Sequence, residues 1–368
     1  MKLSVLIPVY REPKLVGDIV YKLKRNTYEE KDIYVIVDGK TNAEIENALD
    51  DYRKQIHIIY NNTQLGKAKS LNRLALSLDT EILIFLDNDI SLPDDEKFLE
   101  NVANEFGKHD VVEFPKEAVT HSILSGMLGF EFLSYAIAGY SFARIAHRSP
   151  SMNGAAFAIT KKWFAGLNGF HPVINEDMDL ASRAFLRHAR YSYNPGLKVY
   201  NALPASLKEW FNQRKRWAVN NILWLKKNFL HMVKYFFKDA GVRKSLGLVF
   251  LPFIIYIVLY LVLHTLGLTS LLPFILIIGI HFHILIGFLL GLAHFHLIIN
   301  GFIPVILGLL STAVVNFIFS RILRFKFNPI SFLCYYFFYV PVWLLANLVY
   351  GVIVLFNMKI KLDWKVSD

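Results

Sequence analysis

The chain has 368 residues, of which 54% are hydrophobic, and its mean hydropathy is +0.36. This composition excludes an ordinary soluble globular protein and favours a protein with membrane segments. The formal net charge of +10 favours a partner that carries negative charge, which is either an anionic lipid surface or a nucleic acid. The single cysteine, Cys334, excludes an intrachain disulfide.

Short apolar strands and helical segments alternate through residues 1–115. This alternation predicts parallel β-α-β units, in which ligands bind at the carboxyl ends of the strands. Polar residues follow each of these ends, at Tyr10, Asp38, Asn61 and Asp87. The expected strands are Lys2–Val9, Ile33–Val37, Ile56–Tyr60 and Ile82–Leu86, and the expected helices lie around Lys14–Arg25, Asn42–Tyr52 and Lys67–Leu78.

Two carboxylates, Asp87 and Asp89, come directly after the fourth expected strand and are separated by Asn88. A pair of this kind at a strand end can hold Mg²⁺ or Mn²⁺, which take one or two protein carboxylates together with phosphate oxygens. Alone, an Asp-x-Asp sequence is equally typical of a solvated turn. Its position after a buried strand favours a metal site, with Asp89 as the metal ligand.

The segment 118–145 is apolar, and Glu131 is its only charged residue up to Ala143. Its length would allow a membrane span. A single crossing, however, would place the carboxylates before and after it on opposite sides of the membrane. We therefore expect an amphipathic helix that lies in the membrane interface.

Three carboxylates crowd into four residues at Glu176, Asp177 and Asp179. Their mutual repulsion predicts a raised pKa or a cationic partner for at least one of them. One of them is a candidate for the base that takes a proton from a sugar hydroxyl. The alternative is an acid-rich helix N-terminus, which stabilises a helix without any catalytic role.

Residues 204–245 contain ten Lys or Arg against two acids, and they come immediately before the first long apolar run. This position favours a cytoplasmic, lipid-facing segment with a second interface helix at about 205–235, and it disfavours nucleic-acid binding. Within that helix, Arg216 could clamp a diphosphate and Trp217 could stack on a sugar ring. The alternative is a plain juxtamembrane basic helix with an interfacial tryptophan.

Charge-free runs extend from Leu246 to Ser320 and from Phe327 to Met358. They predict about four transmembrane helices, because a span takes about 20 apolar residues. The N-terminal residues do not resemble a signal peptide, so we expect the catalytic part on the cytoplasmic side. Arg321, Arg324 and Lys326 would then lie outside, against the positive-inside preference. The expected spans are 246–266, 269–291, 295–319 and 331–356.

Together, these motifs resemble the family 2 glycosyltransferases, and within them the membrane-bound, cellulose-synthase-like branch. The resemblance covers about residues 3–220. The chain also resembles small archaeal membrane mannosyltransferases. The residues that carry it, in chain order, are Pro8-Val9-Tyr10, Asp38, Gly66-Lys67-Ala68-Lys69-Ser70-Leu71-Asn72, Asp87-Asn88-Asp89, Asn153-Gly154-Ala155-Ala156, Asn168-Gly169-Phe170, Glu176-Asp177 and Gln213-Arg214-Lys215-Arg216-Trp217.

The resemblance implies an α/β GT-A fold, a Rossmann-like nucleotide-sugar-binding domain, and inversion at the anomeric carbon. It implies that Asp177 is the catalytic base with Glu176 beside it, and that Asp89 binds Mg²⁺ or Mn²⁺. The acceptor-binding residues would be Gly154, Gln213 and Trp217. The donor nucleotide and its diphosphate would contact Pro8, Tyr10, Glu12, Asp38, Lys67, Asp87 and Arg216.

We expect three parts: a GT-A domain over 1–203, an interface helix region over 204–240, and transmembrane helices over 246–357. The favoured function is non-processive transfer of a hexose, mannose from GDP-mannose first, to a lipid-linked glycan or glycolipid. One alternative is a processive polysaccharide synthase that uses a UDP-sugar such as UDP-glucose. Another is a transporter or scaffold with a degenerate transferase domain. The partners expected are the nucleotide-sugar donor, the acceptor and membrane lipids, with no nucleic acid.

Overall fold

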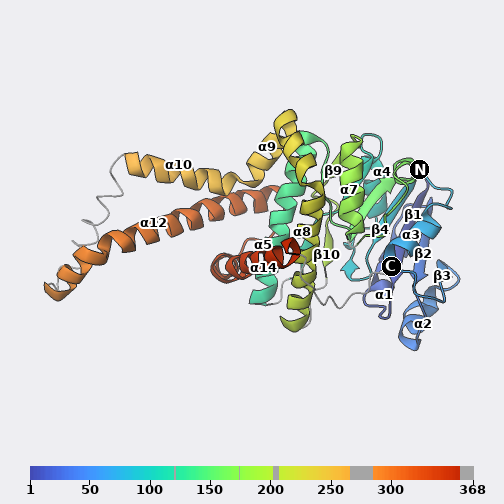
Figure 1. Cartoon of the computed structure of the whole chain (residues 1–368). Coiled ribbons are helices and arrows are strands. Elements are labelled where there is room, and N and C mark those ends of the chain that lie inside the picture. The colour runs from blue at the N-terminus through green and yellow to red at the C-terminus, as the bar shows by residue number, and fades with distance from the viewer. Residues whose placement is uncertain (120–121, 174, 202–206, 266–284, 357–368) are drawn as a thin grey trace. The chain divides into compact units, whose positions relative to one another are not determined.

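The computed structural model describes residues 1–368 except 120–121, 174, 202–206, 266–284 and 357–368 (Figure 1). The chain divides into two compact units. One is formed by Met1–Ser245 together with Asn328–Asp368, and the other by Leu246–Phe327. Each unit is described by itself.

The first unit begins with four parallel strands that alternate with helices, as the sequence predicts. The strands lie in the order β3-β2-β1-β4 within one sheet, so β1 and β4 are interior neighbours. Their carboxyl ends meet at one edge, which is where parallel sheets bind ligands. The elements are β1 (Leu3–Val9), α1 (Val16–Arg25), β2 (Lys31–Val37), α2 (Ala43–Leu49), η1 (Asp50–Tyr52), β3 (His57–Tyr60), α3 (Lys67–Ala75) and β4 (Ile82–Leu86).

Burial explains why these segments form strands and helices where they do. β4 is apolar at every position and buried along its whole length, as a strand covered on both faces must be. The buried residues of α1 recur at the spacing of one helix face, at Val16, Ile19, Val20 and Leu23.

The sheet continues beyond β4 with strands that the sequence did not predict, in the order β4-β8-β6-β9. β8 runs antiparallel to both of its neighbours, so the sheet is mixed. A second sheet of three short strands has the order β5-β10-β7. The elements are β5 (Ile90–Ser91), α4 (Phe98–Glu105), β6 (Val111–Glu113), β7 (Lys116–Ala118), β8 (Ala156–Thr160), α6 (Lys161–Gly166), α7 (Glu176–Leu186), β9 (Tyr191–Tyr193) and β10 (Val199–Asn201).

Long helices complete the first unit. The 118–145 segment forms α5 (Ile123–Ser141), which continues into a π-helical turn, η2 (Phe142–Ala146). The basic segment forms α8 (Leu207–Lys238). α14 packs against α8 (Figure 1). α13 packs against α5. The C-terminal elements are α13 (Pro329–Cys334), η3 (Tyr335–Tyr339) and α14 (Val340–Leu355).

The second unit contains α10 (Leu251–Thr265) and α12 (Leu285–Ile322), which run side by side (Figure 1). α9 (Ala240–Val249) precedes α10, and the two helices are bent by 72°. Of the four spans expected, 269–291 lies mostly outside the described residues.

Three helical segments among the described residues are long and apolar enough to cross a membrane, Ile123–Ala146, Pro304–Ile322 and Pro329–Leu355. The bent pair α9–α10 makes a fourth if it counts as one span. The segment containing α5 therefore passes the same test of length and composition as the C-terminal helices. Half of its most apolar window is buried within the protein.

Candidate active site

The Asp87-Asn88-Asp89 turn lies at the carboxyl end of β4. The Asp87 N–H donates to the carbonyl of Ala155, at 2.8 Å, which ties the turn to the segment that leads into β8. The Asn88 side chain donates to the Glu12 carbonyl at 2.8 Å, and the Asn88 carbonyl accepts from the Leu15 N–H at 2.9 Å. Asn88 thus holds the loop after β1 against the turn.

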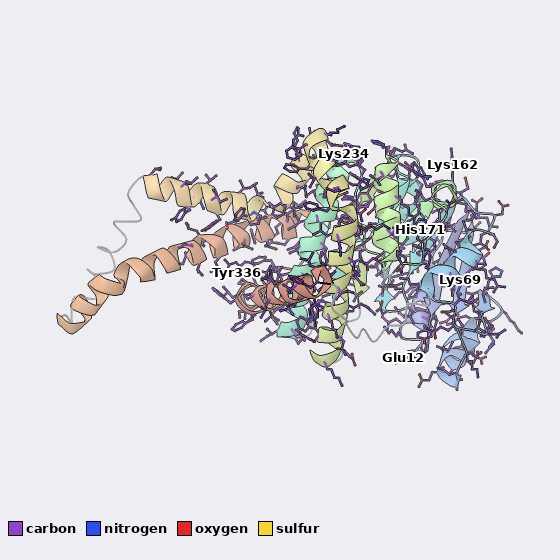
Figure 2. All side chains as sticks on the ribbon, viewed as in Figure 1. Glu12, Lys69, Lys162, His171, Lys234 and Tyr336 are labelled. Atoms are coloured by element: carbon purple, nitrogen blue, oxygen red, sulfur yellow. The ribbon has the colours of Figure 1, made fainter. Side chains whose placement is uncertain are left out.

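The loop after β1 brings Pro8, Tyr10 and Glu12 to this edge of the sheet. Pro8 is the penultimate residue of β1, and Tyr10 forms an isolated bridge with Glu12, which is labelled in Figure 2. Arg11 has a positive φ of 62°, and its guanidinium lies 4.8 Å from the Tyr10 ring centroid. Lys14, from the same loop, is 3.4 Å from the Asp89 carboxylate.

Asp38 follows β2 directly and is hydrogen-bonded to the loop that leads into α3. Its buried carboxylate accepts hydrogen bonds from the N–H groups of Leu65 and Gly66, both at 2.8 Å. It also accepts from the Ser70 hydroxyl at 2.9 Å and the Asn61 amide at 3.2 Å. Asp38 therefore orders the loop that leads into α3, and so positions Lys67 at the start of that helix.

Lys67 joins two of the motifs. Its ammonium is 2.6 Å from the Asp87 carboxylate and 3.5 Å from that of Glu176. Burial lowers the pKa of Lys67, but attraction to Asp87 and Glu176 outweighs burial, and the net shift is upward. Burial raises the pKa of Asp87, although Lys67 opposes the shift. Burial also raises the pKa of Glu176 to about 7, against the attraction of Lys67 and with repulsion from Asp177.

Asp177 is held at the N-terminal end of α7. One carboxylate oxygen accepts from the Gly154 N–H at 2.7 Å, and the other accepts from the Met178 N–H at 2.8 Å. A Cβ on Gly154 would come 2.4 Å from the Asp177 carboxylate, so only glycine allows this approach. Gly154 therefore touches the candidate base itself, which is more specific than the acceptor contact that the sequence predicted.

Asp179, two residues on, is buried and occupied by cations. It pairs with Arg183 at 2.7 Å, Lys227 at 2.8 Å and His171 at 3.1 Å; His171 is labelled in Figure 2. Burial raises the pKa of Asp179, but hydrogen bonds from Lys227 and Arg183 outweigh burial, and the net shift is downward. Its contacts attach α7 to α8.

The side-chain amide of Asn72 joins the Gly-Lys-Ala motif at residues 66–72 to the Asn-Gly-Phe motif at residues 168–170. The Asn72 side chain accepts from the Phe170 N–H at 2.8 Å and donates to the Phe170 carbonyl at 2.7 Å. Gly169 has φ +63°, and a Cβ there would meet the Asn72 oxygen at 2.4 Å. Phe170 packs edge-on against Phe85 of β4. These contacts hold the two motifs against β4, whose carboxyl end carries the Asp87-Asn88-Asp89 turn.

In α8, Arg214 contacts two of the motif residues as well as α5 and η3, although the sequence predicted no role for it. Arg214 is buried and pairs with the equally buried Glu131 of α5. It also donates to the Tyr339 hydroxyl at 2.9 Å and to the Gln213 amide oxygen at 2.6 Å. Its guanidinium lies 4.2 Å from the Trp217 ring centroid. Arg214 therefore fixes two predicted acceptor residues, while Arg216 is half-buried.

Two more charged residues near the site escaped prediction. Glu113, at the end of β6, is buried and accepts from the Tyr191 hydroxyl at 2.7 Å. Burial raises its pKa to about 7, against this hydrogen bond. Lys116, which begins β7, is also buried. For both Glu113 and Lys116, the only sign of a role in the sequence is a charged residue that follows a short apolar segment.

The residues of the Asp-x-Asp turn fit a hard divalent cation. Asp87 and Asp89 are each paired with a lysine, and the adjoining Glu176 and Asp177 add negative charge. No group of three or more His, Cys, Asp or Glu side chains arranged for a metal occurs among the residues that the structure describes. Mg²⁺ commonly takes one or two carboxylates and completes its shell with water and substrate phosphate.

Curated relatives of this chain include two bacterial poly-β-1,6-N-acetyl-D-glucosamine synthases. The Staphylococcus epidermidis protein is 26% identical over 246 residues, which is 63% of this chain and 57% of that protein. The Staphylococcus aureus protein is 24% identical over 244 residues, with the same two shares. The chain thus spans less than two thirds of the length of these relatives.

Among solved structures, a mannosyltransferase from Pyrobaculum calidifontis in complex with GDP-Man and Mn²⁺ is similar, with a TM-score of 0.51 and 16% identity. The match covers 67% of this chain and 73% of that one, and it supports the GT-A fold.

Two family models match the chain. The glycosyl transferase family 2 model matches residues 4–116, and the glycosyl transferase family group 2 model matches residues 82–357. The second match covers most of the chain and includes all of the acidic and α8 motifs. The chain therefore belongs to the family 2 glycosyltransferases and has a GT-A fold.

Proposed function

We propose that this enzyme transfers one hexose at a time from a nucleotide sugar to a lipid-linked glycan or glycolipid at the cytoplasmic face of a membrane. One observation carries the proposal: Asp177, Glu176, Lys67 and Asp87 form a continuous cluster in which both oxygens of the Asp177 carboxylate accept backbone N–H hydrogen bonds. The cluster joins the donor motifs to the acceptor motifs. Such an arrangement suits a base that acts beside a departing diphosphate.

In this mechanism, Asp177 accepts the proton of an acceptor hydroxyl. Each of its oxygens accepts one backbone hydrogen bond, which leaves further lone pairs for the substrate. As the proton leaves, the hydroxyl oxygen bonds to C1 of the donor sugar, and the bond from C1 to the phosphate oxygen breaks. One base suffices, because a diphosphate leaves without protonation, unlike the leaving group in glycoside hydrolysis.

The leaving diphosphate needs positive charge around it. Lys67 and Arg216 are the cations that we assign to it, and Lys67 is already placed between Asp87 and Glu176. Asp89, with Asp87, would hold Mg²⁺ or Mn²⁺, which when bound neutralises charge on the diphosphate. Asp179 takes no part in proton transfer, because Arg183, Lys227 and the His171 ring already contact its carboxylate.

For the donor we favour GDP-mannose. The support is the resemblance of the motifs to archaeal mannosyltransferases and the GDP-Man complex of the similarly folded Pyrobaculum protein. At 16% identity that likeness establishes the fold, so the sugar is a proposal that a donor screen must decide.

The second candidate is a processive synthase that uses a UDP-sugar. The observation that favours it is the similarity to poly-β-1,6-N-acetyl-D-glucosamine synthases, which makes N-acetylglucosamine the main competing sugar, ahead of glucose. The two candidates differ in product: a single addition leaves a short glycolipid, whereas a synthase yields a polymer.

We further propose four membrane spans and a cytoplasmic catalytic unit. The apolar helices among the described residues support membrane insertion. In this topology α5 lies in the interface, since Glu131 within it is paired with Arg214 of α8. Reporter fusions after residue 325 and at the C-terminus test it. Opposite sides are expected, and a cytoplasmic residue 325 would contradict four spans.

The function itself is tested with purified, detergent-solubilised enzyme or native membranes. Radiolabelled GDP-mannose, UDP-glucose and UDP-N-acetylglucosamine are each assayed for donor hydrolysis and for transfer to extracted lipid. The proposal expects one labelled sugar on a lipid-extractable product with GDP-mannose. A high-molecular-weight product from a UDP-sugar would establish the synthase instead.

A further inference from the structure

Lys116 is a largely buried cation that contacts aromatic rings rather than an anion. Lys116 is only 8% exposed. No described residue makes a hydrogen bond or an ion pair with its ammonium. The next residue, Glu117, points to the other face of β7 and pairs with Lys198 at 2.9 Å. A lysine that is this far buried and makes no ion pair with a described residue is unusual, so its presence requires an explanation.

The surroundings of Lys116 are aromatic and catalytic. Its ammonium lies 5.2 Å from the Phe132 ring centroid and 5.7 Å from that of Trp217. In the small sheet, β7 and β5 flank β10, and β5 directly follows the Asp87-Asn88-Asp89 turn. The strongest electrostatic attractions on Lys116 come from Asp89 and Asp87. Lys116 therefore lies beside Trp217 and feels the negative charge of Asp87 and Asp89.

We propose that Lys116 is a phosphate-binding residue, which contributes its charge to a substrate phosphate between the Asp-x-Asp turn and Trp217. The proposal rests on the function proposed above. A phosphate supplies several acceptor oxygens at once, which an ammonium with three free donors can use.

Two substrates could supply this phosphate: the donor, through its diphosphate, and the acceptor, through the phosphate that links a glycan to its lipid. The chemistry is the same for both. A rival explanation gives Lys116 a structural role only, as a cation packed on the Trp217 ring. Binding measurements separate all three, because they do not depend on turnover.

The test uses the full chain in detergent, as wild type and as Lys116→Gln, Lys116→Arg and Lys108→Gln. Lys116→Arg keeps the charge, and Lys108→Gln removes the same charge from an exposed turn. The probes are GDP and UDP with Mn²⁺ for the donor, and dolichyl phosphate in phosphatidylcholine vesicles for the lipid. A thermal unfolding midpoint is recorded for each variant to show that it folds.

We expect Lys116→Gln to weaken binding of one probe by tenfold or more, while Lys116→Arg stays within about threefold and Lys108→Gln is unchanged. Weaker GDP or UDP binding assigns Lys116 to the donor, and weaker dolichyl phosphate binding assigns it to the acceptor. Unchanged binding of all probes by a folded Lys116→Gln would overturn the proposal. If Lys116→Gln does not fold, binding of every probe that does not respond to salt, in both wild type and Lys116→Arg, would also overturn it. A wild-type enzyme that binds GDP or UDP but transfers no sugar to lipid would instead count against the proposed function, whatever the Lys116 variants do.

Discussion

Gly154 and Asp177 touch: the Gly154 N–H donates to the Asp177 carboxylate at 2.7 Å, and a Cβ on Gly154 would come 2.4 Å from the same oxygen. Gly154→Ala must therefore displace Asp177. Because a displacement of about 1 Å at a catalytic group can cost about 10²-fold in rate, transfer should fall by about that factor. Binding of GDP should change little. The assay compares kcat for transfer with the Kd for GDP.

The matched control for this substitution is Gly107→Ala, since a Cβ at Gly107 meets nothing within 4 Å. It should keep wild-type activity. Full transfer by Gly154→Ala would show that Asp177 is free to move, or that it is not the base.

Removal of divalent cations should abolish transfer. EDTA is expected to stop the reaction, and Mn²⁺ or Mg²⁺ to restore it, since Asp87 and Asp89 are hard oxygen ligands at a strand end. Asp89→Ala should weaken donor binding as well as turnover. Donor binding is measured by titration with and without Mn²⁺. Undiminished activity in chelator would remove the metal assignment.

Arg216 and Trp217 should differ although they are neighbours, because adjacent helical residues point about 100° apart. Arg216→Ala is expected to reduce both transfer and futile donor hydrolysis, since it removes charge from the leaving group. Trp217→Ala should reduce transfer and spare hydrolysis. Both rates are measured on the same membrane preparation.

Trp217→Phe serves as the control for membrane anchoring, because it keeps an aromatic ring at the interface. The Arg214 guanidinium and the Lys116 ammonium both approach the Trp217 ring, so only the area that they leave uncovered can meet a sugar. Equal loss of transfer and hydrolysis in Trp217→Ala would discard the acceptor role.

Glu113 should make the protein less stable as the pH rises. Its pKa is about 7 in the folded protein, against an ordinary 4.5. Between these values the folded state binds more protons than the unfolded state, so the free energy of unfolding falls as pH rises and stays lower above pH 7. Glu113→Gln can still accept from Tyr191 and should remove this loss. One pKa unit corresponds to about 1.4 kcal/mol, so the gain at pH 8 is a few kcal/mol at most.

The measurement is the thermal unfolding midpoint in detergent at pH 5, 6, 7 and 8. Glu100→Gln, an exposed carboxylate on α4, is the control and should follow the wild type. Parallel pH profiles for Glu113→Gln and wild type would show that this carboxyl is ordinary. Glu176, with a pKa also near 7, leaves a residual slope in both proteins.

The first half of the fold was predictable because β4, most of β1 and the 33–37 part of β2 are apolar, and amphipathic helices separate these strands. β6, β7, β9 and β10 have three residues each, too few to show any period. The antiparallel insertion of β8 depends on tertiary pairing with β4 and β6, which no local pattern specifies.

Within the site, the motif residues were predictable and their partners were not. Glu131 and Arg214 are 83 residues apart, and each alone resembles an ordinary charge in an amphipathic helix. Asp38 follows a strand end, as ligand-binding residues do, but its oxygens are occupied by the loop at Leu65–Gly66. Sequence position identifies the edge of the sheet, whereas hydrogen-bond partners decide which residues remain available to a substrate.

The most direct test of the account is Asp177→Asn, assayed for GDP binding and for transfer on the same folded preparation. Asn keeps the size of the side chain and can still accept from the Gly154 N–H, but it cannot take the proton. We predict GDP binding within about threefold of wild type and transfer lower by about 10²–10⁴-fold, the usual cost of losing a general base. Transfer near the wild-type rate by Asp177→Asn would contradict the central claim, and the base would then have to be sought elsewhere in the cluster.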